Sequence, residues 1–311
     1  MGLISKLYVK SLLGRYNKEA GIPYYSHQDF NGLHQEAMTF KNSKSLGISY
    51  YFYYYDNYKT DKLILFLHGI GPGHTAYLAE IEQLAKRGYK VLTLDYEGCE
   101  SSEGKNIGSL TNPTKNVVEL LDYLEIDKPI IVVGHSLGGF TALNIVHLRD
   151  EIKTAVIMSG FLSVESLVRT SVKSKFVCNR ILQYERKASP EYFELDNLKY
   201  LETTDNRILF IQSEDDKVVP FSIALNVVEK IQNNNIKKIK VQNRKHNPNY
   251  TDEAVAYMNS VMGTFSNLKK QHKIKTEEDA INYFKDVSLA KLVQQDEQMF
   301  DQICEFIEKR F

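Results

Sequence analysis

One serine stands in a sequence context suited to nucleophilic chemistry. Ser136 lies within Gly-His-Ser-Leu-Gly-Gly over residues 134–139, directly after the apolar run 130–133 and before a segment with helical periodicity. Glycines at these positions let a strand and a helix approach closely, and the strained turn between them projects the hydroxyl outward. Because G-x-S-x-G stands here between a strand and a helix, it predicts that Ser136 is a nucleophile. The N–H of Leu137, at the start of that helix, is then available to an oxyanion.

A second glycine-rich stretch precedes the serine by about sixty residues. His-Gly-Ile-Gly-Pro-Gly occupies residues 68–73 and follows the apolar run 63–67. Open α/β sheets place their sites at the carboxyl ends of the parallel strands, so this loop is expected beside the serine. We expect the backbone N–H of Ile70 to be the second oxyanion donor, with Gly71 as the alternative. A phosphate loop is disfavoured because Gly-Lys-Ser/Thr is missing.

A base and an acid follow the serine along the chain. Asp215 and Asp216 come after a later apolar run, and His246 comes after the last predicted strand. Either aspartate could orient the histidine, and periodicity does not choose between them. His246 is predicted to be the general base, because the only later histidine, His272, lies in a polar helical stretch. His135, next to the serine on a sharp turn, points elsewhere and is expected to support the turn.

The elements that must position these residues form a repeating pattern. Short apolar runs with the length of buried parallel strands alternate with helical segments, as right-handed crossovers require. The runs are residues 63–67, 90–94, 130–133, 154–158, 208–211 and 237–241. Two aromatic-rich runs, 36–40 and 48–55, are typical of an antiparallel pair. The expected fold class is α/β, with a doubly wound, mostly parallel sheet.

The predicted domain organisation is one sheet domain with three additions. The interval 161–201 is too long for a simple connection and carries a mixed helical pattern, so it is expected to form a helical lid. The core then comprises 36–160 and 202–265, preceded by a helical extension over 1–35 and followed by C-terminal helices over 266–311. The last of these helical segments is expected over 289–311. Apolar side chains at helical spacing over residues 2–16 predict a helix that docks on the body of the protein, with peripheral contact to a membrane surface as the alternative.

Composition excludes several classes of function. Lysine plus arginine and aspartate plus glutamate each number 39, so no overall positive field attracts nucleic acid. The three cysteines are widely spaced and form neither CxxC nor an even framework, which favours a reducing cytoplasm and argues against a thiolate metal site. No signal peptide is indicated, and no stretch approaches the ~20 apolar residues of a transmembrane helix.

The chain resembles the lipase, esterase and serine-aminopeptidase-like branch of the α/β-hydrolase superfamily over about residues 36–265. In relatives the acid precedes a residue pair and then Val-Pro, which maps onto Asp216 with Asp215 as the fallback. The turn at 95–104 departs from the family's D-x-R-G-x-G-x-S at Glu97, Cys99 and Glu100. The motifs that carry the resemblance are HGIG at 68–71, DYEGCESSEG at 95–104, GHSLGG at 134–139, SEDDKVVP at 213–220 and HNP at 246–248.

The resemblance and the three residues imply acyl transfer with neither a metal nor an organic cofactor. The expected substrate is a small acyl ester, cleaved by a carboxylesterase or monoacylglycerol-lipase-like activity, because a helical lid commonly forms an apolar acyl pocket. A serine peptidase or a thioesterase of the same fold is the alternative. A catalytically silent fold used as a binding module is a third reading, disfavoured because no member of the triad is missing.

Overall fold

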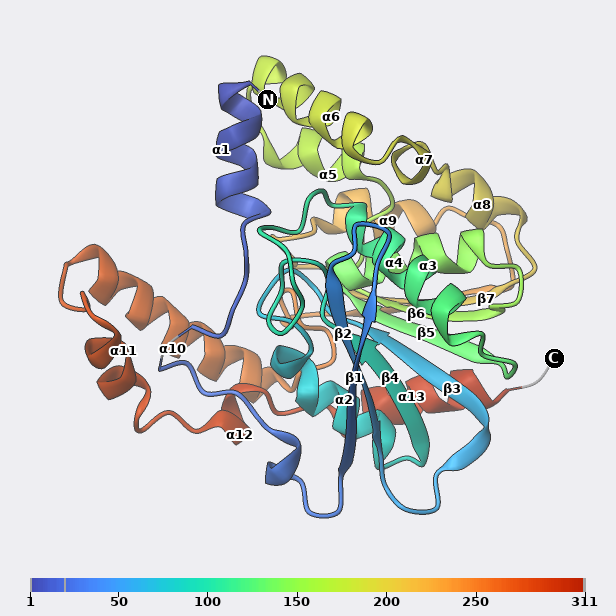
Figure 1. The fold of residues 1–311 in the computed structure, drawn as a ribbon, viewed down its shortest axis with the longest axis horizontal. Helices are drawn as coiled ribbons and strands as arrows, with labels where there is room; N and C mark the ends of the chain where they lie inside the picture. The colour runs from blue at the N-terminus through green and yellow to red at the C-terminus, as the bar shows by residue number, and fades with distance from the viewer. Residues whose placement is uncertain (1, 20, 310–311) are drawn as a thin grey trace.

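An eight-stranded sheet forms the centre of the computed structural model, which describes residues 2–19 and 21–309 (Figure 1). The strand order is β1-β2-β4-β3-β5-β6-β7-β8. β1 (His34–Lys41) and β2 (Gly47–Tyr54) pair antiparallel, and β2 is also antiparallel to β4. The others run parallel: β3 (Lys59–Leu67), β4 (Tyr89–Leu94), β5 (Ile130–His135), β6 (Thr154–Met158), β7 (Arg207–Ser213) and β8 (Ile236–Val241). The predicted doubly wound, mostly parallel sheet is confirmed.

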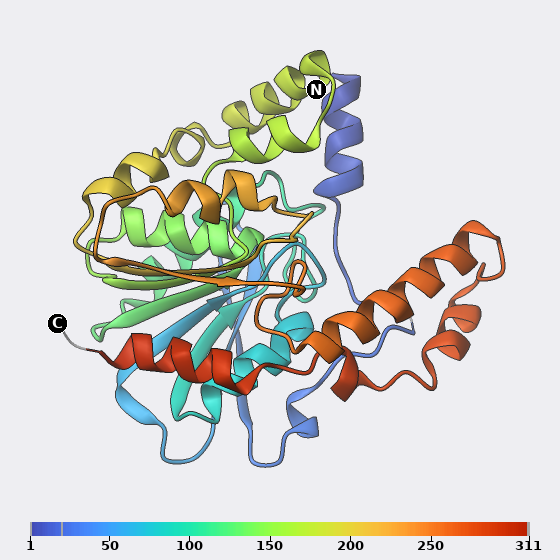
Figure 2. The same cartoon turned by 180° about the vertical axis from the view of Figure 1, so that it is seen from behind.

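Side chains of the central strands alternate between two cores, as the pleat requires. Leu65 belongs to one hydrophobic cluster, whereas Ile64 and Phe66 belong to the other. The first core is covered by α3 (Asn112–Leu124), α4 (Leu137–Leu148) and α9 (Leu225–Val228), and the second by α2 (Leu78–Ala85) and α13 (Glu297–Glu308), as Figure 2 shows. Burial on both faces explains why these strands are apolar throughout rather than alternating.

Four helices follow β6 in the stretch predicted to form the lid. They are α5 (Val164–Ser171), α6 (Lys175–Ala188), α7 (Pro190–Phe193) and α8 (Asn197–Thr203). Side-chain oxygens of Ser163, Ser174 and Asp196 accept backbone N–H groups at the starts of α5, α6 and α8. Such capping supplies acceptors for amides that the first helical turn cannot pair.

The N-terminal helix is shorter than the periodicity predicted. α1 spans Leu3–Leu12 rather than continuing to residue 16, and it lies beside α6 (Figure 1). Beyond it the chain runs over the body, where the Arg15 guanidinium donates to the carbonyl oxygens of Ser102 (2.9 Å) and Gly104 (2.9 Å). Within the described residues, no helix has both the length and the apolar character needed to cross a bilayer.

The C-terminal segment differs in one respect from its prediction. α10 (Asp252–Lys270) and α11 (Glu277–Phe284) project from the sheet, as Figure 2 shows. Their buried apolar side chains form a small core of their own. A helical segment was expected over 289–311, but the helix α12 (Leu289–Leu292) ends early. The chain leaves helical geometry because Gln295 pairs with Tyr250 in an antiparallel bridge, and Asp296 then caps α13 through the N–H of Met299.

Candidate active site

Ser136 occupies a strained turn between β5 and α4. Its φ of 56° and ψ of −120° lie outside the regions that a non-glycine residue ordinarily adopts. The turn is tight because backbone atoms approach from two sides: a Cβ at Gly138 would stand 2.0 Å from the Leu67 carbonyl oxygen, and one at Gly134 would stand 2.1 Å from the Gly138 oxygen. Only glycine fits at these two positions, so the elbow geometry follows from the sequence pattern.

Asp216 and His246 form a hydrogen-bonded pair beyond the ends of β7 and β8. His246 Nδ1 lies 2.9 Å from Asp216 Oδ2, and the aspartate side chain is fully buried. Asp216 Oδ1 accepts the backbone N–H groups of Val218 (2.9 Å) and Val219 (3.0 Å), which fix the carboxylate. A carboxylate at Nδ1 holds the proton on that nitrogen and leaves Nε2 free to accept one.

Asp215, the alternative acid, contacts Lys245 and Ser213 instead of the histidine. Its carboxylate forms an ion pair with Lys245 Nζ at 2.7 Å and accepts the Ser213 hydroxyl at 2.6 Å. Burial alone would raise the pKa of Asp215, but these hydrogen bonds outweigh it and lower the pKa to about 2. The structure thus brings Asp216, and not Asp215, to His246.

His135 connects the serine elbow to the loop that carries the base. Its Nε2 lies 2.7 Å from the His246 carbonyl oxygen, and its Nδ1 lies 3.0 Å from the Tyr77 hydroxyl. Burial lowers the pKa of His135 to about 3, so the ring is neutral. Because a carbonyl only accepts, Nε2 carries the proton and Nδ1 accepts from the tyrosine. Sequence reasoning assigned His135 only a support of the elbow, and nothing in the sequence points to this tie.

His246 lies beside His135, the residue that precedes Ser136. Ser136 adjoins His135, whose ring centroid lies 4.8 Å from that of His246. Among the described residues, no hydrogen bond joins the Ser136 hydroxyl to His246 Nε2. Catalytic hydrogen bonds are often loose before substrate binds and tighten in the complex.

The loop after His246 rests on a buried polar network that sequence analysis missed. The Asn249 amide donates to Gln295 Oε1 (2.7 Å) and to Glu80 Oε1 (3.3 Å). Burial raises the pKa of Glu80 to about 7. The Asp296 N–H also donates to the Asn249 carbonyl oxygen at 2.8 Å. These contacts fix the chain just beyond the histidine from α2 and the segment before α13.

The two predicted oxyanion donors and Ser136 line one apolar cavity. Ile70 and Leu137 line this cavity together with Ser136, and within the described part of the chain neither backbone N–H has an acceptor. Gly69 permits the close approach, because a Cβ there would stand 3.1 Å from the Ser136 Cβ and 2.5 Å from the Tyr77 hydroxyl.

Buried groups also anchor the loop that carries Ile70. His68 Nδ1 donates to the Gly69 carbonyl oxygen at 2.7 Å, and burial lowers the pKa of His68 to about 4. Asp95 Oδ1 accepts the backbone N–H of His74 at 2.9 Å and lies 2.8 Å from its Nδ1. A donor held on both sides in this way is pre-organised for a charge that develops during reaction.

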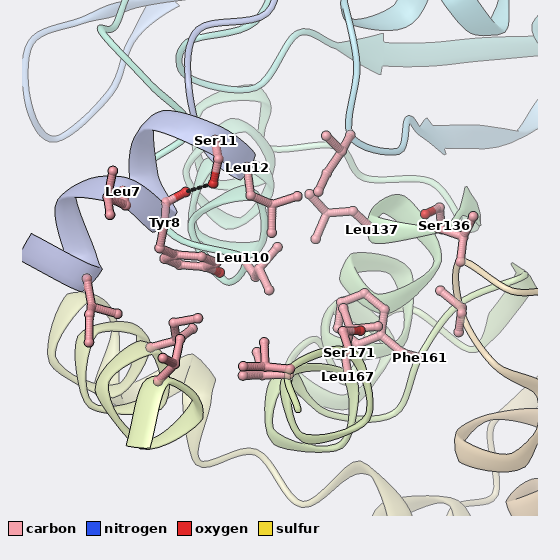
Figure 3. Close-up of a pocket in the computed structure, with 18 residues that line it drawn as sticks. Leu7, Tyr8, Ser11, Leu12, Leu110, Ser136, Leu137, Phe161, Leu167 and Ser171 are labelled. Atoms are coloured by element: carbon pink, nitrogen blue, oxygen red, sulfur yellow. Dashed lines mark hydrogen bonds between the residues drawn. The ribbon is translucent and has the colours of Figure 1, made fainter. Parts of the chain in front are cut away.

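An apolar cavity of about 530 Å³ extends from Ser136 toward the lid (Figure 3). This volume lies in the usual range for small-molecule sites. Its walls come from the elbow, the lid helices α5 and α6, and α1; Figure 3 shows Leu7 and Tyr8 across the open space from Ser136. The polar residues among those lining it are Tyr8, Ser11, Ser136 and Ser171.

Two hydrogen bonds to a buried carboxyl group, which we call the Glu185 clasp, join three segments that line the cavity. Glu185 of α6 accepts the Tyr8 hydroxyl of α1 at 2.7 Å and the Leu110 backbone N–H at 2.9 Å. Glu185 is completely buried, and this burial raises its pKa to about 7. This clasp fixes α1 as a wall of the cavity rather than a free extension.

Comparison with known proteins finds relatives among hydrolases. Residues 58–191 match the family model described as serine aminopeptidase, S33. Lysophosphatidylserine lipase ABHD12 of Gallus gallus is 28% identical over 186 residues, covering 52% of this chain and 45% of that protein. A 2-hydroxy-6-oxononadienedioate/2-hydroxy-6-oxononatrienedioate hydrolase of Escherichia coli O81 (strain ED1a) is 30% identical over 133 residues, covering 40% and 46%. The matches thus span less than half the length of these relatives.

Solved structures share the fold over most of the chain. The esterase Pf2001 of Pyrococcus furiosus superimposes with a TM-score of 0.58 at 17% identity, covering 83% of this chain and 97% of that one. Est1E of Butyrivibrio proteoclasticus, solved with ferulic acid, gives a TM-score of 0.57 at 20% identity, covering 74% and 97%. At such identities the likeness concerns the fold. With its sheet topology, the family match over 58–191 and these structural neighbours, the chain has the α/β-hydrolase fold.

Proposed function

We propose that this protein is a serine hydrolase that cleaves carboxylic esters through an acyl-enzyme on Ser136. The observation that carries the proposal is the apolar cavity that opens on Ser136, beside the Asp216–His246 pair. An apolar wall suits an acyl chain and offers few partners to a peptide backbone, whose polar groups need hydrogen bonds when buried. Relatives named as a lipase and as esterases are consistent with this substrate class.

The proposed reaction begins with proton transfer from the Ser136 hydroxyl to His246 Nε2. The serine oxygen attacks the ester carbonyl carbon, and the resulting oxyanion accepts the N–H groups of Ile70 and Leu137. Asp216 stabilises the imidazolium that forms. The tetrahedral intermediate collapses to the acyl-enzyme as His246 returns the proton to the departing alcohol. Water, deprotonated by His246, then attacks the acyl carbon, and the carboxylic acid leaves as Ser136 regains its proton.

A fluorophosphonate probe tests the nucleophile. The wild type should be labelled, whereas Ser136→Ala should remain unlabelled and lose on the order of 10⁶-fold in kcat, because the other members of the triad act through this hydroxyl. Ser171→Ala is the matched control, since Ser171 lines the same cavity at a distance from the elbow and should be labelled normally. Equal labelling of wild type and Ser136→Ala would remove the assignment.

The bond that is cleaved is tested separately. p-Nitrophenyl esters of graded chain length, acyl-CoA thioesters and aminoacyl anilides are compared by kcat/KM. We expect esters of medium or long acyl chains to be preferred, because each methylene that enters the apolar cavity contributes about 0.8 kcal/mol. A preference for the anilides would replace esterase by peptidase, and a preference for acyl-CoA would replace it by thioesterase.

A further inference from the structure

The outer face of α1 carries alternating apolar and basic side chains. Leu3, Lys6, Leu7 and Lys10 recur at intervals of three and four residues, so they share one face of the helix. All four are exposed, and the exposed fractions of Leu3 and Leu7 are 74% and 57%. Tyr8 points to the opposite side, into the clasp with the lid. An exposed helix face with this composition is typical of a segment that lies on a lipid surface.

The beginning of α6 extends this face. Phe176, with an exposed fraction of 64%, lines a groove of about 480 Å³ together with Leu3 and Ile4 of α1. Ile4 also lines the apolar cavity that opens on Ser136, which we call the acyl cavity after its proposed function, so groove and cavity are adjacent. Figures 1 and 2 both place the starts of α1 and α6 together at one edge of the molecule. We call the exposed residues of α1 and of 173–187 the α1–α6 surface.

Exposed apolar side chains concentrate at these two cavities. Nine large hydrophobic residues are exposed in the described part of the chain, and five of them line the groove or the acyl cavity. The five are Leu3, Leu7, Leu12, Phe176 and Val218. Singly scattered apolar residues need no explanation, but a cluster at the rim of a cavity indicates an interaction surface.

The same surface is positively charged although the chain is neutral. Neither residues 2–18 nor 166–184 contain an aspartate or glutamate, and Glu185 is buried. Arg169 and Arg186 are paired with carboxylates. Among the described residues, six other basic side chains here have no carboxylate partner: Lys6, Lys10, Lys173, Lys175, Arg180 and Lys187. Charge complementarity therefore selects an anionic partner.

We propose that the α1–α6 surface docks the protein on an anionic phospholipid bilayer. Leu3 and Phe176 enter the boundary between headgroups and acyl chains, while Lys6 and Lys10 contact lipid phosphates. The acyl cavity, which shares Ile4 with the docking groove, then lies next to the bilayer, so a single-chain lipid can enter it from there. Docking itself does not depend on Ser136, whereas the entry of a substrate rests on the proposed esterase function.

Vesicle flotation of the full chain tests the docking. We expect wild type to bind phosphatidylcholine vesicles that contain phosphatidylglycerol, and to bind pure phosphatidylcholine vesicles at least about tenfold more weakly. Lys6→Gln/Lys10→Gln should weaken binding to anionic vesicles by about tenfold or more, since each basic side chain near such a surface contributes on the order of a factor of five. Leu3→Ser/Phe176→Ser should weaken it similarly, because insertion loses its apolar anchors.

Matched variants distinguish docking from general damage. Lys270→Gln/Lys273→Gln and Ile281→Ser alter exposed side chains in the α10–α11 region and should bind vesicles like wild type. Ser136→Ala should also bind normally, so failure of the proposed catalysis and failure of docking are told apart. Cleavage of a short-chain water-soluble ester should be unchanged in the four α1–α6 substitutions. Absence of wild-type binding, equal binding to neutral vesicles, or an equal loss in the α10–α11 controls would overturn the proposal.

Discussion

At the scale of single residues, two adjacent aspartates serve different partners. Asp216 is fully buried, with His246 Nδ1 and two backbone N–H groups around its carboxylate. Asp215 is partly exposed; its carboxylate forms an ion pair with Lys245 Nζ and accepts a hydrogen bond from the Lys245 backbone N–H. Both carboxylates contact the loop after β8, which carries Lys245 and His246. Only Asp216 contacts the His246 ring, so only Asp216 can fix its tautomer.

Substituting the two aspartates separately should give unequal losses. Asp216→Asn is expected to lower kcat/KM by about 10⁴-fold, because an amide no longer favours the proton on Nδ1 or stabilises an imidazolium. Asp215→Asn removes a partly exposed ion pair and should change kcat/KM by about twofold. Steady-state kinetics on one p-nitrophenyl ester compares them, with circular dichroism as the control for folding. A larger loss in Asp215→Asn would reverse the assignment.

At the scale of elements, the N-terminal segment explains the unusual turn after β4. Glu97, Cys99 and Glu100 depart from the family's usual sequence there, and two of them contact the segment directly. Tyr16 pairs with Cys99 in a parallel bridge, and the Glu100 N–H donates to the Tyr16 carbonyl oxygen at 2.7 Å. Lys18 pairs with the Glu100 carboxylate at 3.7 Å. The departure therefore coincides with a docking site for the segment that follows α1.

The Glu185 clasp should make the packing of α1 on the lid depend on pH. Burial raises the pKa of Glu185 from 4.5 to about 7, so the folded protein binds this proton more tightly than the unfolded chain. Stability from this group is therefore complete below pH 4.5, falls as the pH rises toward 7, and stays lower above it. The full effect is on the order of 3 kcal/mol.

Glu185→Gln isolates this contribution. The amide can accept the Leu110 N–H and donate to the Tyr8 hydroxyl, as a protonated carboxyl would. Urea unfolding at several pH values should show that wild type loses stability between about pH 4.5 and 7 relative to the variant, because other titrating groups cancel in the comparison. Parallel curves for the two proteins across this range would show that Glu185 does not titrate there.

At the scale of the whole molecule, the apolar cavity at Ser136 exists only because segments distant in sequence meet. Its walls combine Leu7 and Leu12 of α1, Leu167 of the lid, and Val219 beyond β7. No one of these segments encloses space by itself. Under the proposed function, the length of the preferred substrate depends on the assembled molecule, and it should respond to a substitution far along the chain from Ser136.

Filling the cavity from α5 should shorten the preferred acyl chain. Ser171→Phe places an aromatic ring where a small hydroxyl side chain now lines the cavity. Thr170→Phe is the matched control, because the adjacent Thr170 is exposed and does not line the cavity. If four methylenes lose their place, kcat/KM for a long-chain ester should fall on the order of 100-fold, since each contributes about 0.8 kcal/mol. An acetate ester should be cleaved nearly as by wild type. An unchanged chain-length profile in Ser171→Phe would contradict the placement of the acyl chain.

The sequence by itself determined those features whose signal is local. Buried parallel strands read as apolar runs, and the elbow around Ser136 depends on glycines a few residues away, so both could be predicted. The order of acid and base along the chain limited the remaining partners to Asp215 or Asp216 and His246. The helix after 289 was mispredicted because its break depends on the bridge between Gln295 and Tyr250, a pairing that periodicity does not record.

Tertiary structure alone decided what depends on contacts between distant residues. The Tyr8 hydroxyl and Glu185 are 177 residues apart, yet their hydrogen bond makes α1 a wall of the cavity. Likewise, His135 meets the carbonyl of His246 only because β5 and the loop after β8 end at the same edge of the sheet. Such contacts leave no periodic or spacing pattern in the sequence. Tyrosine, glutamate and histidine side chains also occur on exposed surfaces, so residue type alone does not reveal which of them are buried as pairs.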